Sequence, residues 1–320
     1  MTAITDRRSS VRDAWRLTKP YWLSEEKGRA WGLLIVVVAL NLGNVYIDVR
    51  INLWNNAFYN AIQQLNEHEF FRQLGIFSVL AGLAIAISVY ALYLNQMLQI
   101  FWRRWLTRRF VGAWLADRAY FRLQLQGYGT DNPDQRIADD LNMFTSYVLS
   151  LSLGFMTSVV SLVSFLFILW GLSGPARVPL GPLGSLYIPA YLVWAALLYA
   201  GVGTWLTVKI GRPLVPLNFA QQRFEADFRF SLVRLRENAE SIAFYGGEAP
   251  ESEVFLRRFT RVVDNFWRIM IRRKFLNWFT TGYGQIAIIF PYVVAAPRYF
   301  SKQIQMGGLM QVADAFLSVQ

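Results

Sequence analysis

The chain has 320 residues, of which 54% are hydrophobic and 16% aromatic, and it carries a formal net charge of +11. Its charges gather in blocks between apolar stretches that are too long for a soluble helix, a pattern that excludes a basic nucleic-acid binder. There is no cysteine, and His68 is the single histidine, so disulfides, thiolate or His-rich metal sites and Cys nucleophiles are excluded.

Residues 1–30 are expected to form a cytoplasmic N-terminus that contains an interfacial elbow helix. The segment Arg12–Trp22 mixes Trp, Tyr and Leu with basic residues just before the first apolar run. Such a mixture favours a helix that lies in the inner membrane interface, with a disordered basic tail as the alternative. Because the first thirty residues or so lack an early apolar core, we do not expect them to be a cleavable signal peptide.

Residues 31–320 are expected to form an all-α, polytopic transmembrane domain. A membrane-spanning helix needs roughly 20 mostly apolar residues. Five stretches qualify: Trp31–Trp54, the charge-free runs between Arg72 and Arg103 and between Asp140 and Arg177, Tyr187–Lys209, and Phe275–Pro297. A sixth begins near Met306, and a span that ends at Gln320 would be too short to cross. The sixth helix is therefore expected to be incomplete and the chain to be truncated.

The distribution of Lys and Arg predicts the orientation of these spans. Residues 1–30 hold 7 basic residues, 101–140 hold 7 and 209–275 hold 13, which together are 27 of the 32 in the chain. The alternate connections hold only Arg72, Arg177, and the pair Arg298 and Lys302. Since basic connections stay in the cytoplasm, the N-terminus is predicted to be cytoplasmic.

The first inner connection is predicted to be two helices joined at a sharp turn. Aromatic residues recur at helical spacing from Trp105 to Phe121. Gly127 and Gly129 should then break the helix, since glycine is common at helix ends. Asp131–Gln135 restarts a helix, in which Asn132 can cap the first free amides.

The second inner connection repeats this organisation. Pro213 and Pro216 follow the fourth span, and an amphipathic helix then runs from Phe219 through Leu235. Gly246-Gly247 is expected to end that helix, and Glu248 to begin the next one. The two turns either form a docking surface for a partner or only support the helix bundle, and the pattern alone leaves both readings open.

Three sequence segments resemble one family. They are LWNNAFYNAIQQ (Leu53–Gln64), NPDQRIADD (Asn132–Asp140) and RFEADFRFSLVRLRENAESIAFYGGE (Arg223–Glu248). The chain resembles, over roughly residues 10–320, the ATP-binding-cassette transporters of the ABCD type and their bacterial relatives, whose membrane domain the SbmA/BacA-like peptide transporters share. The resemblance implies a six-helix, exporter-type transmembrane domain with long cytoplasmic helix extensions, working as a homodimer in the bacterial inner membrane.

The resemblance also implies that the two inner turns are coupling helices that contact nucleotide-binding domains. On this chain they would be Gly127–Asn132 and Tyr245–Pro250. The residues that the resemblance assigns to coupling are Gly127, Tyr128, Gly129, Asn132, Asp134, Gln135, Arg136, Asp139 and Asp140 at the first turn, and Glu237, Asn238, Glu240, Tyr245, Gly246, Gly247 and Glu248 at the second.

The chain itself contains no nucleotide-binding motif. A phosphate loop needs GxxxxGK[ST], and no lysine here follows a glycine. We therefore expect no catalytic residue, metal ligand or cofactor in this chain, and expect ATP and Mg in an absent nucleotide-binding domain on the same or a separate chain. The ENAESIAFYGGE segment favours the ATP-driven branch. The alternatives are a proton-coupled SbmA/BacA-like peptide transporter and a membrane enzyme or receptor, for which no constellation of catalytic residues is present.

Polar and aromatic residues within the spans are candidates for the substrate pathway, since such groups are costly in a bilayer. They are Asp48, Arg50, Trp54, Tyr59, Asn95, Gln96 and Gln285. Structural roles compete with each assignment: anchoring at the outer rim for Asp48 and Arg50, an aromatic belt for Trp54 and Tyr59, and hydrogen bonds between helices for the amides. Peptides, cobalamin-like compounds and fatty acyl groups are the substrates that the resemblance implies.

Overall fold

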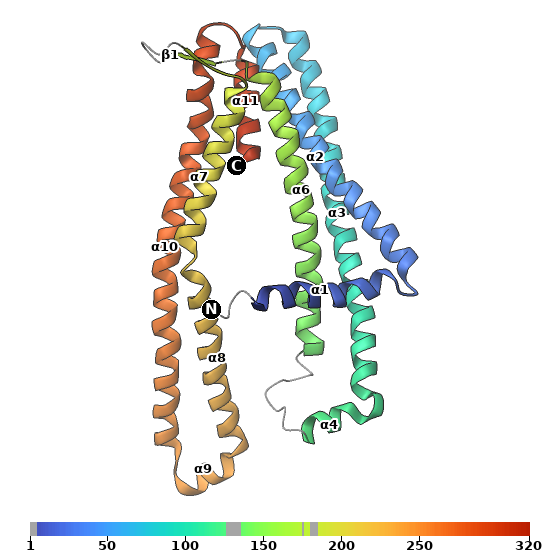
Figure 1. Ribbon diagram of the computed structural model, residues 1–320, viewed down its shortest axis with the longest axis vertical. Coiled ribbons are helices and arrows are strands. Elements are labelled where there is room, and N and C mark those ends of the chain that lie inside the picture. The colour runs from blue at the N-terminus through green and yellow to red at the C-terminus, as the bar shows by residue number, and fades with distance from the viewer. Residues whose placement is uncertain (1–4, 126–135, 175, 180–184) are drawn as a thin grey trace. The chain divides into compact units, whose positions relative to one another are not determined.

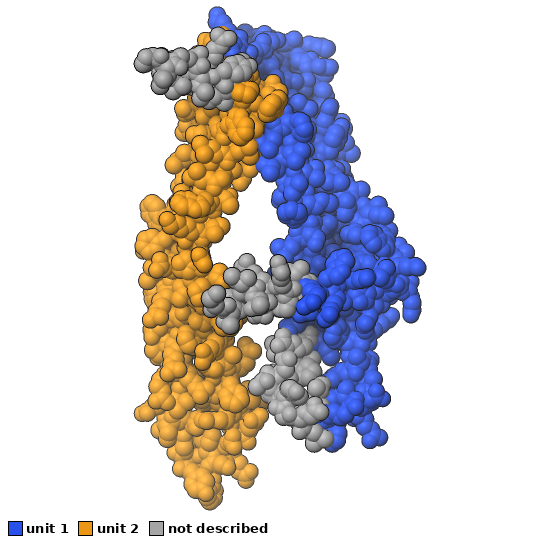
Figure 2. Space-filling view, in the orientation of Figure 1, with its two compact units in different colours: residues 1–168, 302–318 blue, residues 169–301, 319–320 orange. Residues whose placement is uncertain are grey.

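The computed structural model describes residues 5–125, 136–174, 176–179 and 185–320 of the chain. Nearly all of these residues are helical, apart from a short antiparallel hairpin of β1 (Ala176–Pro179) and β2 (Ser185–Ile188), in which Arg177 pairs with Tyr187. The all-α, polytopic class predicted from the sequence is confirmed. The chain divides into two compact units, residues 1–168 with 302–318 and residues 169–301 with 319–320 (Figure 2).

The first unit is centred on two long helices that pack side by side (Figure 1). Its elements are α1 (Thr5–Trp22), α2 (Lys27–Gln63), α3 (Glu67–Leu115), η1 (Ala116–Arg118), α4 (Ala119–Leu125), η2 (Arg136–Asp140), most of α6 (Leu141–Leu172) and α11 (Met306–Val319). A tight turn joins α2 to α3, and Asn66 caps α3 by accepting a hydrogen bond from the Glu69 amide at 3.1 Å.

An aromatic cluster anchors the end of α1. Tyr21 is 1% exposed and stacks on Trp102 of α3, with ring centroids 5.7 Å apart. Burial, with a smaller contribution from the Glu26 carboxylate, raises the pKa of Tyr21 to about 12. Arg104 of α3 forms an ion pair with Glu26 at 3.2 Å. The segment Arg12–Trp22 lies within α1 and is helical, while its position in a membrane interface stays a prediction.

The second unit is a set of long helices in which α10 runs beside both α7 and α8. Its elements are the end of α6, the β1–β2 hairpin, α7 (Tyr191–Gly211), α8 (Leu214–Glu237), α9 (Ala239–Tyr245) and α10 (Glu248–Phe300). Pro213 precedes the first residue of α8, as the sequence predicts for the end of the fourth span.

A close contact between two tyrosines fastens α7 to α10. The rings of Tyr199 and Tyr283 stack with centroids 4.3 Å apart. The Tyr199 hydroxyl donates to the Tyr283 carbonyl at 2.6 Å, and the Tyr283 hydroxyl donates to the Tyr199 carbonyl at 2.5 Å. Gly203 permits this approach, because a Cβ there would lie 2.5 Å from the Tyr283 ring.

Five helical segments in the described part of the chain are long and apolar enough to cross a membrane. Each contains most of one span predicted from the sequence, but the third helix ends at Leu172 and the fourth begins at Tyr191 instead of Tyr187, which belongs to β2. α10 has 53 residues, so at 1.5 Å per residue it is about 80 Å long, against about 30 Å for the hydrocarbon core of a bilayer. More than half of α10 must therefore lie outside the hydrocarbon.

Two of the predicted helices are interrupted. The helix expected from Trp105 to Phe121 breaks after Leu115, where Asp117 and Arg118 adopt left-handed φ values of 49° and 56°. The helix expected to continue from Leu235 to Gly246-Gly247 ends at Glu237. Neither break contains Gly or Pro, so the sequence gives no strong signal for either of them.

Candidate functional site

The tip of the α8–α10 hairpin is a short helix set off by a break on each side. Asn238 ends α8: its amide donates to the Arg234 carbonyl at 3.1 Å, and its side chain donates to the same carbonyl at 2.8 Å. The Asn238 carbonyl then accepts from the Ile242 amide, which begins α9. Gly246 has φ +65°, and the Gly247 amide donates to the Ile242 carbonyl at 2.9 Å. This left-handed C-cap requires a residue such as glycine, so the predicted Gly246-Gly247 turn is confirmed.

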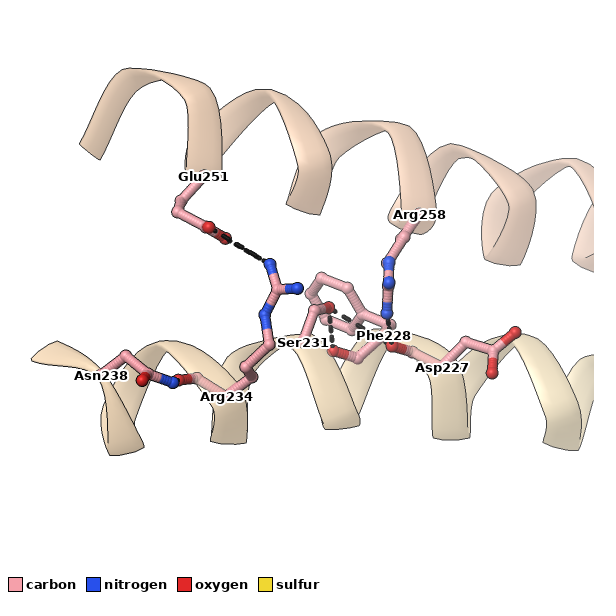
Figure 3. A network of polar contacts seen from close by, with 7 residues as sticks. All are labelled: Asp227, Phe228, Ser231, Arg234, Asn238, Glu251 and Arg258. Carbon is pink, nitrogen blue, oxygen red and sulfur yellow. Dashed lines mark hydrogen bonds and ion pairs between the residues drawn. The ribbon is translucent and has the colours of Figure 1, made fainter. Parts of the chain in front are cut away.

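Polar contacts between α8 and α10 repeat along these two helices, beginning next to the tip (Figure 3). Arg234 of α8 pairs with Glu251 of α10 at 3.2 Å. Seven residues further along α10, the Arg258 guanidinium donates to the Asp227 carbonyl at 2.6 Å. A spacing of seven residues keeps successive contacts on one helix face, as in coiled-coil packing. The tip is therefore carried by two helices that are held together by side-chain contacts.

A further contact lies one heptad beyond Arg258. The buried side chain of Asn265 donates to the Leu217 carbonyl and to Gln221 Oε1, both at 2.9 Å. Between these polar contacts, the Phe228 and Phe259 rings pack with centroids 5.4 Å apart. We call the contacts of Glu251, Arg258 and Asn265 with α8 the hairpin ladder.

The surface of the tip is aromatic and acidic. Phe244 is 83% exposed and Tyr245 is 82% exposed, and their rings meet edge to face at 5.3 Å. The exposed carboxyl groups of Glu237, Glu240 and Glu248 lie on the same short stretch. Exposed adjacent aromatic side chains are typical of a surface that binds a protein partner. The structure thus gathers the predicted second-turn residues at one tip and adds Phe244, which the sequence reasoning missed.

The predicted first turn is only partly within the described residues. Arg136, Asp139 and Asp140 belong to η2, a π-helical turn at the start of α6, and Arg103 donates to the Ala138 carbonyl at 2.9 Å. The other first-turn residues lie outside the described residues: Gly127, Tyr128, Gly129, Asn132, Asp134 and Gln135. The assignment of η2 to partner contact stays a prediction.

The predicted pathway residues lie on several helices of the two units, and each is described within its own unit. Within α2, Asp48 and Arg50 are exposed, whereas the Trp54 indole donates to the Gln73 carbonyl at 2.8 Å. Tyr59 meets the ring of Phe58. In the other helices, Gln96 and Gln285 are exposed, and Asn95 Oδ1 is buried without a hydrogen-bond partner among the described residues.

A polar seam between α2 and α11 was missed as a set by the sequence reasoning. Asn56 donates to Gln311 Oε1 at 2.6 Å, and Asn60 Oδ1 accepts from the Gly307 amide at 2.8 Å. Asn55 donates to the Asp314 carboxylate. The asparagines recur at helical spacing within LWNNAFYNAIQQ, so a stripe was visible, but its partner lies about 250 residues away in the sequence. We call these contacts the α2–α11 seam.

These features define a class of protein: a polytopic α-helical membrane protein in which a spanning helix continues into a long, braced hairpin with an exposed tip. A family model described as ABC transporter transmembrane region 2 matches residues 17–300. The chain belongs to this family, and it is the transmembrane region of an ABC transporter. The resemblance to ABCD-type transporters is confirmed.

Several curated relatives agree with this membership. ABC transporter D family member 2, chloroplastic, of Arabidopsis thaliana is 39% identical over 317 residues, which cover 97% of this chain and 42% of the relative. Inner membrane ABC transporter ATP-binding protein YddA of Escherichia coli is 37% identical, over 95% of this chain and 54% of the relative. Lysosomal cobalamin transporter ABCD4 of Homo sapiens is 25% identical, over 84% and 42% respectively. The chain spans about half the length of the curated relatives it matches.

Proposed function

We propose that this chain is the permease half of an ATP-driven transporter that moves its substrate across a bacterial inner membrane by alternating access. The observation that carries the proposal is the exposed tip of Phe244 and Tyr245 at the end of the hairpin ladder. In this proposal the tip binds a nucleotide-binding domain, on the same or a separate chain, which holds ATP and Mg. Two copies of the chain form a homodimer, with the N-terminus in the cytoplasm.

The charge distribution supports this orientation. Residues 209–275 include all of α8 and α9, and they hold 13 of the 32 basic residues. Because basic connections remain on the cytoplasmic side, the tip is expected on the side where ATP is available. The relatives whose printed names contain "ATP-binding protein" support the same energy source.

The residues of this chain would couple the two ends of the transporter mechanically. ATP hydrolysis supplies the free energy when nucleotide is bound by the partner domain. Phe244 and Tyr245 bury their rings in that partner, and the breaks at Asn238 and Gly246 let α9 turn relative to α8 and α10. The hairpin ladder makes α8 and α10 move together, so displacement of the tip reaches the membrane-spanning part of α10.

We propose that the transported substrate is a peptide, a cobalamin-like compound or a fatty acyl compound. The human relative is named a lysosomal cobalamin transporter, and this supports cobalamin-like compounds at the level of the family only.

The test uses the whole transporter with its nucleotide-binding domains in proteoliposomes. The double substitution Phe244→Ala, Tyr245→Ala should lower transport per ATP hydrolysed by at least about tenfold, because buried aromatic anchors dominate interface energetics. The matched control is Phe219→Ala, which truncates an α8 side chain that is 73% exposed and far along the helix from the tip. The control should transport like the unmodified protein.

Two outcomes would refute the proposal. One is unchanged transport per ATP in the tip variant when its folding is intact. The other is transport that ignores ATP depletion but stops when the proton gradient collapses, which would favour a proton-coupled SbmA/BacA-like permease.

A further inference from the structure

A cavity of about 300 Å³ continues the α2–α11 seam beyond its last hydrogen bond, and all of it lies within the first unit. α2 contributes Asp48, Asn52 and Asn55 to its lining, α11 contributes Asp314, and Phe165 comes from α6. Because α2 and α11 run antiparallel along the seam, these positions follow directly from the pairing of Asn56 with Gln311.

The polar lining consists mainly of hydrogen-bond acceptors. Asp48 and Asp314 each bring a carboxyl group, and none of the described residues that line the cavity is basic. The Ser318 hydroxyl donates to the Asp314 carbonyl at 3.0 Å, so its hydrogen is already used and its oxygen is left as an acceptor. A group that carries hydrogen-bond donors and positive charge would complement this lining.

One acceptor in this lining is orphaned. Asn52 is 2% exposed, and its Nδ2 donates to the Gln311 carbonyl at 3.0 Å. Its Oδ1 has no hydrogen-bond partner among the described residues. A buried acceptor left without a donor is costly, and Asn52 is one of the residues that line this acceptor-rich cavity. A ligand in the cavity is therefore the source from which we expect the missing donor.

The rest of the lining indicates the kind of cation. Ile51, Phe165 and Leu317 add apolar surface next to the acceptors. A calcium ion takes six to eight oxygen ligands and magnesium needs near-octahedral geometry, whereas an ammonium group donates three hydrogen bonds and carries an apolar stem. Among the described residues there is no group of three or more His, Cys, Asp or Glu able to hold a metal ion. An aromatic face such as Phe165 also attracts an ammonium group.

We propose that this cavity, with Asp48, Asp314 and the unpartnered Asn52 Oδ1, binds a primary ammonium group of the transported substrate. The ammonium donates to the two carboxylates and to Asn52, and its aliphatic stem lies on Phe165 and Leu317. The role of the cavity in transport rests on the proposed function, while the binding itself does not.

The test measures binding of radiolabelled n-hexylamine to the whole protein in nanodiscs. Asp314→Asn and Asp48→Asn should each weaken binding by about ten- to a hundredfold, since hydrogen bonds to charged groups are the strong ones. Asp264→Asn, which neutralises an exposed carboxyl group on α10, is the matched control and should bind like the unmodified protein. Asp314→Glu should retain much of the affinity, because it keeps a carboxylate in the lining.

Three outcomes would overturn the proposal: equal affinity in Asp314→Asn, displacement of n-hexylamine by n-hexanol as effective as by unlabelled amine, or displacement by NaCl or MgCl₂ at constant ionic strength. Failure of this binding with ATP coupling at the tip intact would remove only the ammonium site. Binding that persists in a protein whose transport ignores ATP would remove only the proposed function.

Discussion

Substitution of Gly203 by alanine tests the close contact between α7 and α10. The added Cβ would lie 2.5 Å from Cε1 of Tyr283, which is closer than real Cβ contacts, and 3.1 Å from its Cζ. The Tyr283 ring cannot turn away freely, because it stacks on Tyr199 and exchanges hydrogen bonds with it. Alanine therefore either strains the backbone or displaces the ring.

The expected cost follows from these contacts. Overpacking costs about 1–3 kcal/mol. A displaced ring loses a stack worth about 0.5–1.5 kcal/mol and hydrogen bonds worth about 0.6 kcal/mol each between membrane helices. Either route costs about 2 kcal/mol, from which the gain of roughly 0.5–1 kcal/mol for replacing a helical glycine is subtracted. We therefore expect a net loss of about 1 kcal/mol in the free energy of unfolding, measured by reversible titration with a denaturing detergent and followed by tryptophan fluorescence.

Gly201→Ala is the matched control for this experiment. Gly201 is in the same helix, and a Cβ there would meet nothing within 4 Å. Alanine at that position should stabilise the protein by roughly 0.5–1 kcal/mol, because glycine is the poorer helix former. The reasoning fails if the free energy of unfolding of Gly203→Ala is within about 0.5 kcal/mol of that of the unmodified protein. It also fails if Gly203→Ala lowers this free energy by the same amount when Tyr283 is already alanine.

Three further substitutions test the tip, the seam and the ladder. Gly246→Ala should destabilise the left-handed cap of α9 by about 1 kcal/mol, seen as faster amide hydrogen exchange in α9, and Gly246→Asn should cost less. Gly307→Ala should loosen α11 and speed its amide exchange, since the new Cβ would overlap the Asn56 carbonyl; Gly308→Ala, with only ordinary contacts, should not. Asn265→Leu should cost about 1–3 kcal/mol in detergent unfolding, because it removes two hydrogen bonds to α8 and leaves Gln221 Oε1 without its donor; an unchanged midpoint would contradict the ladder.

The membrane-spanning helices and the Gly246 turn could be predicted from the sequence because their signals are local. Long charge-free runs identify the spans, and a glycine pair after an amphipathic run marks a left-handed cap. The breaks at Asp117 and Asn238 were not predictable in this way. Asp and Asn tolerate unusual backbone conformations, but they also occur in ordinary helices, so a single residue of either type is a weak signal.

The α2–α11 seam could not be predicted because its partners are far apart along the chain. Asp314 was visible as a polar residue in an apolar helix, and the asparagines of α2 were visible as a stripe. Only the fold places Asn55 beside Asp314 and leaves Asn52 Oδ1 without a donor. Pairing of this kind depends on the antiparallel register of two helices, which periodicity within either helix does not determine.

The hairpin ladder also has a mechanical consequence. Two helices that are joined by side-chain contacts at intervals can bend only if those contacts slide or break. The pair is therefore far stiffer than either helix alone. α8 and α10 are tied near Glu251, Arg258 and Asn265, at steps of one heptad. When the tip is displaced, the two helices therefore tilt together and do not bend along their length. Because a few side chains determine this stiffness, a substitution such as Asn265→Leu would make the α8–α10 pair more flexible while both helices remain intact.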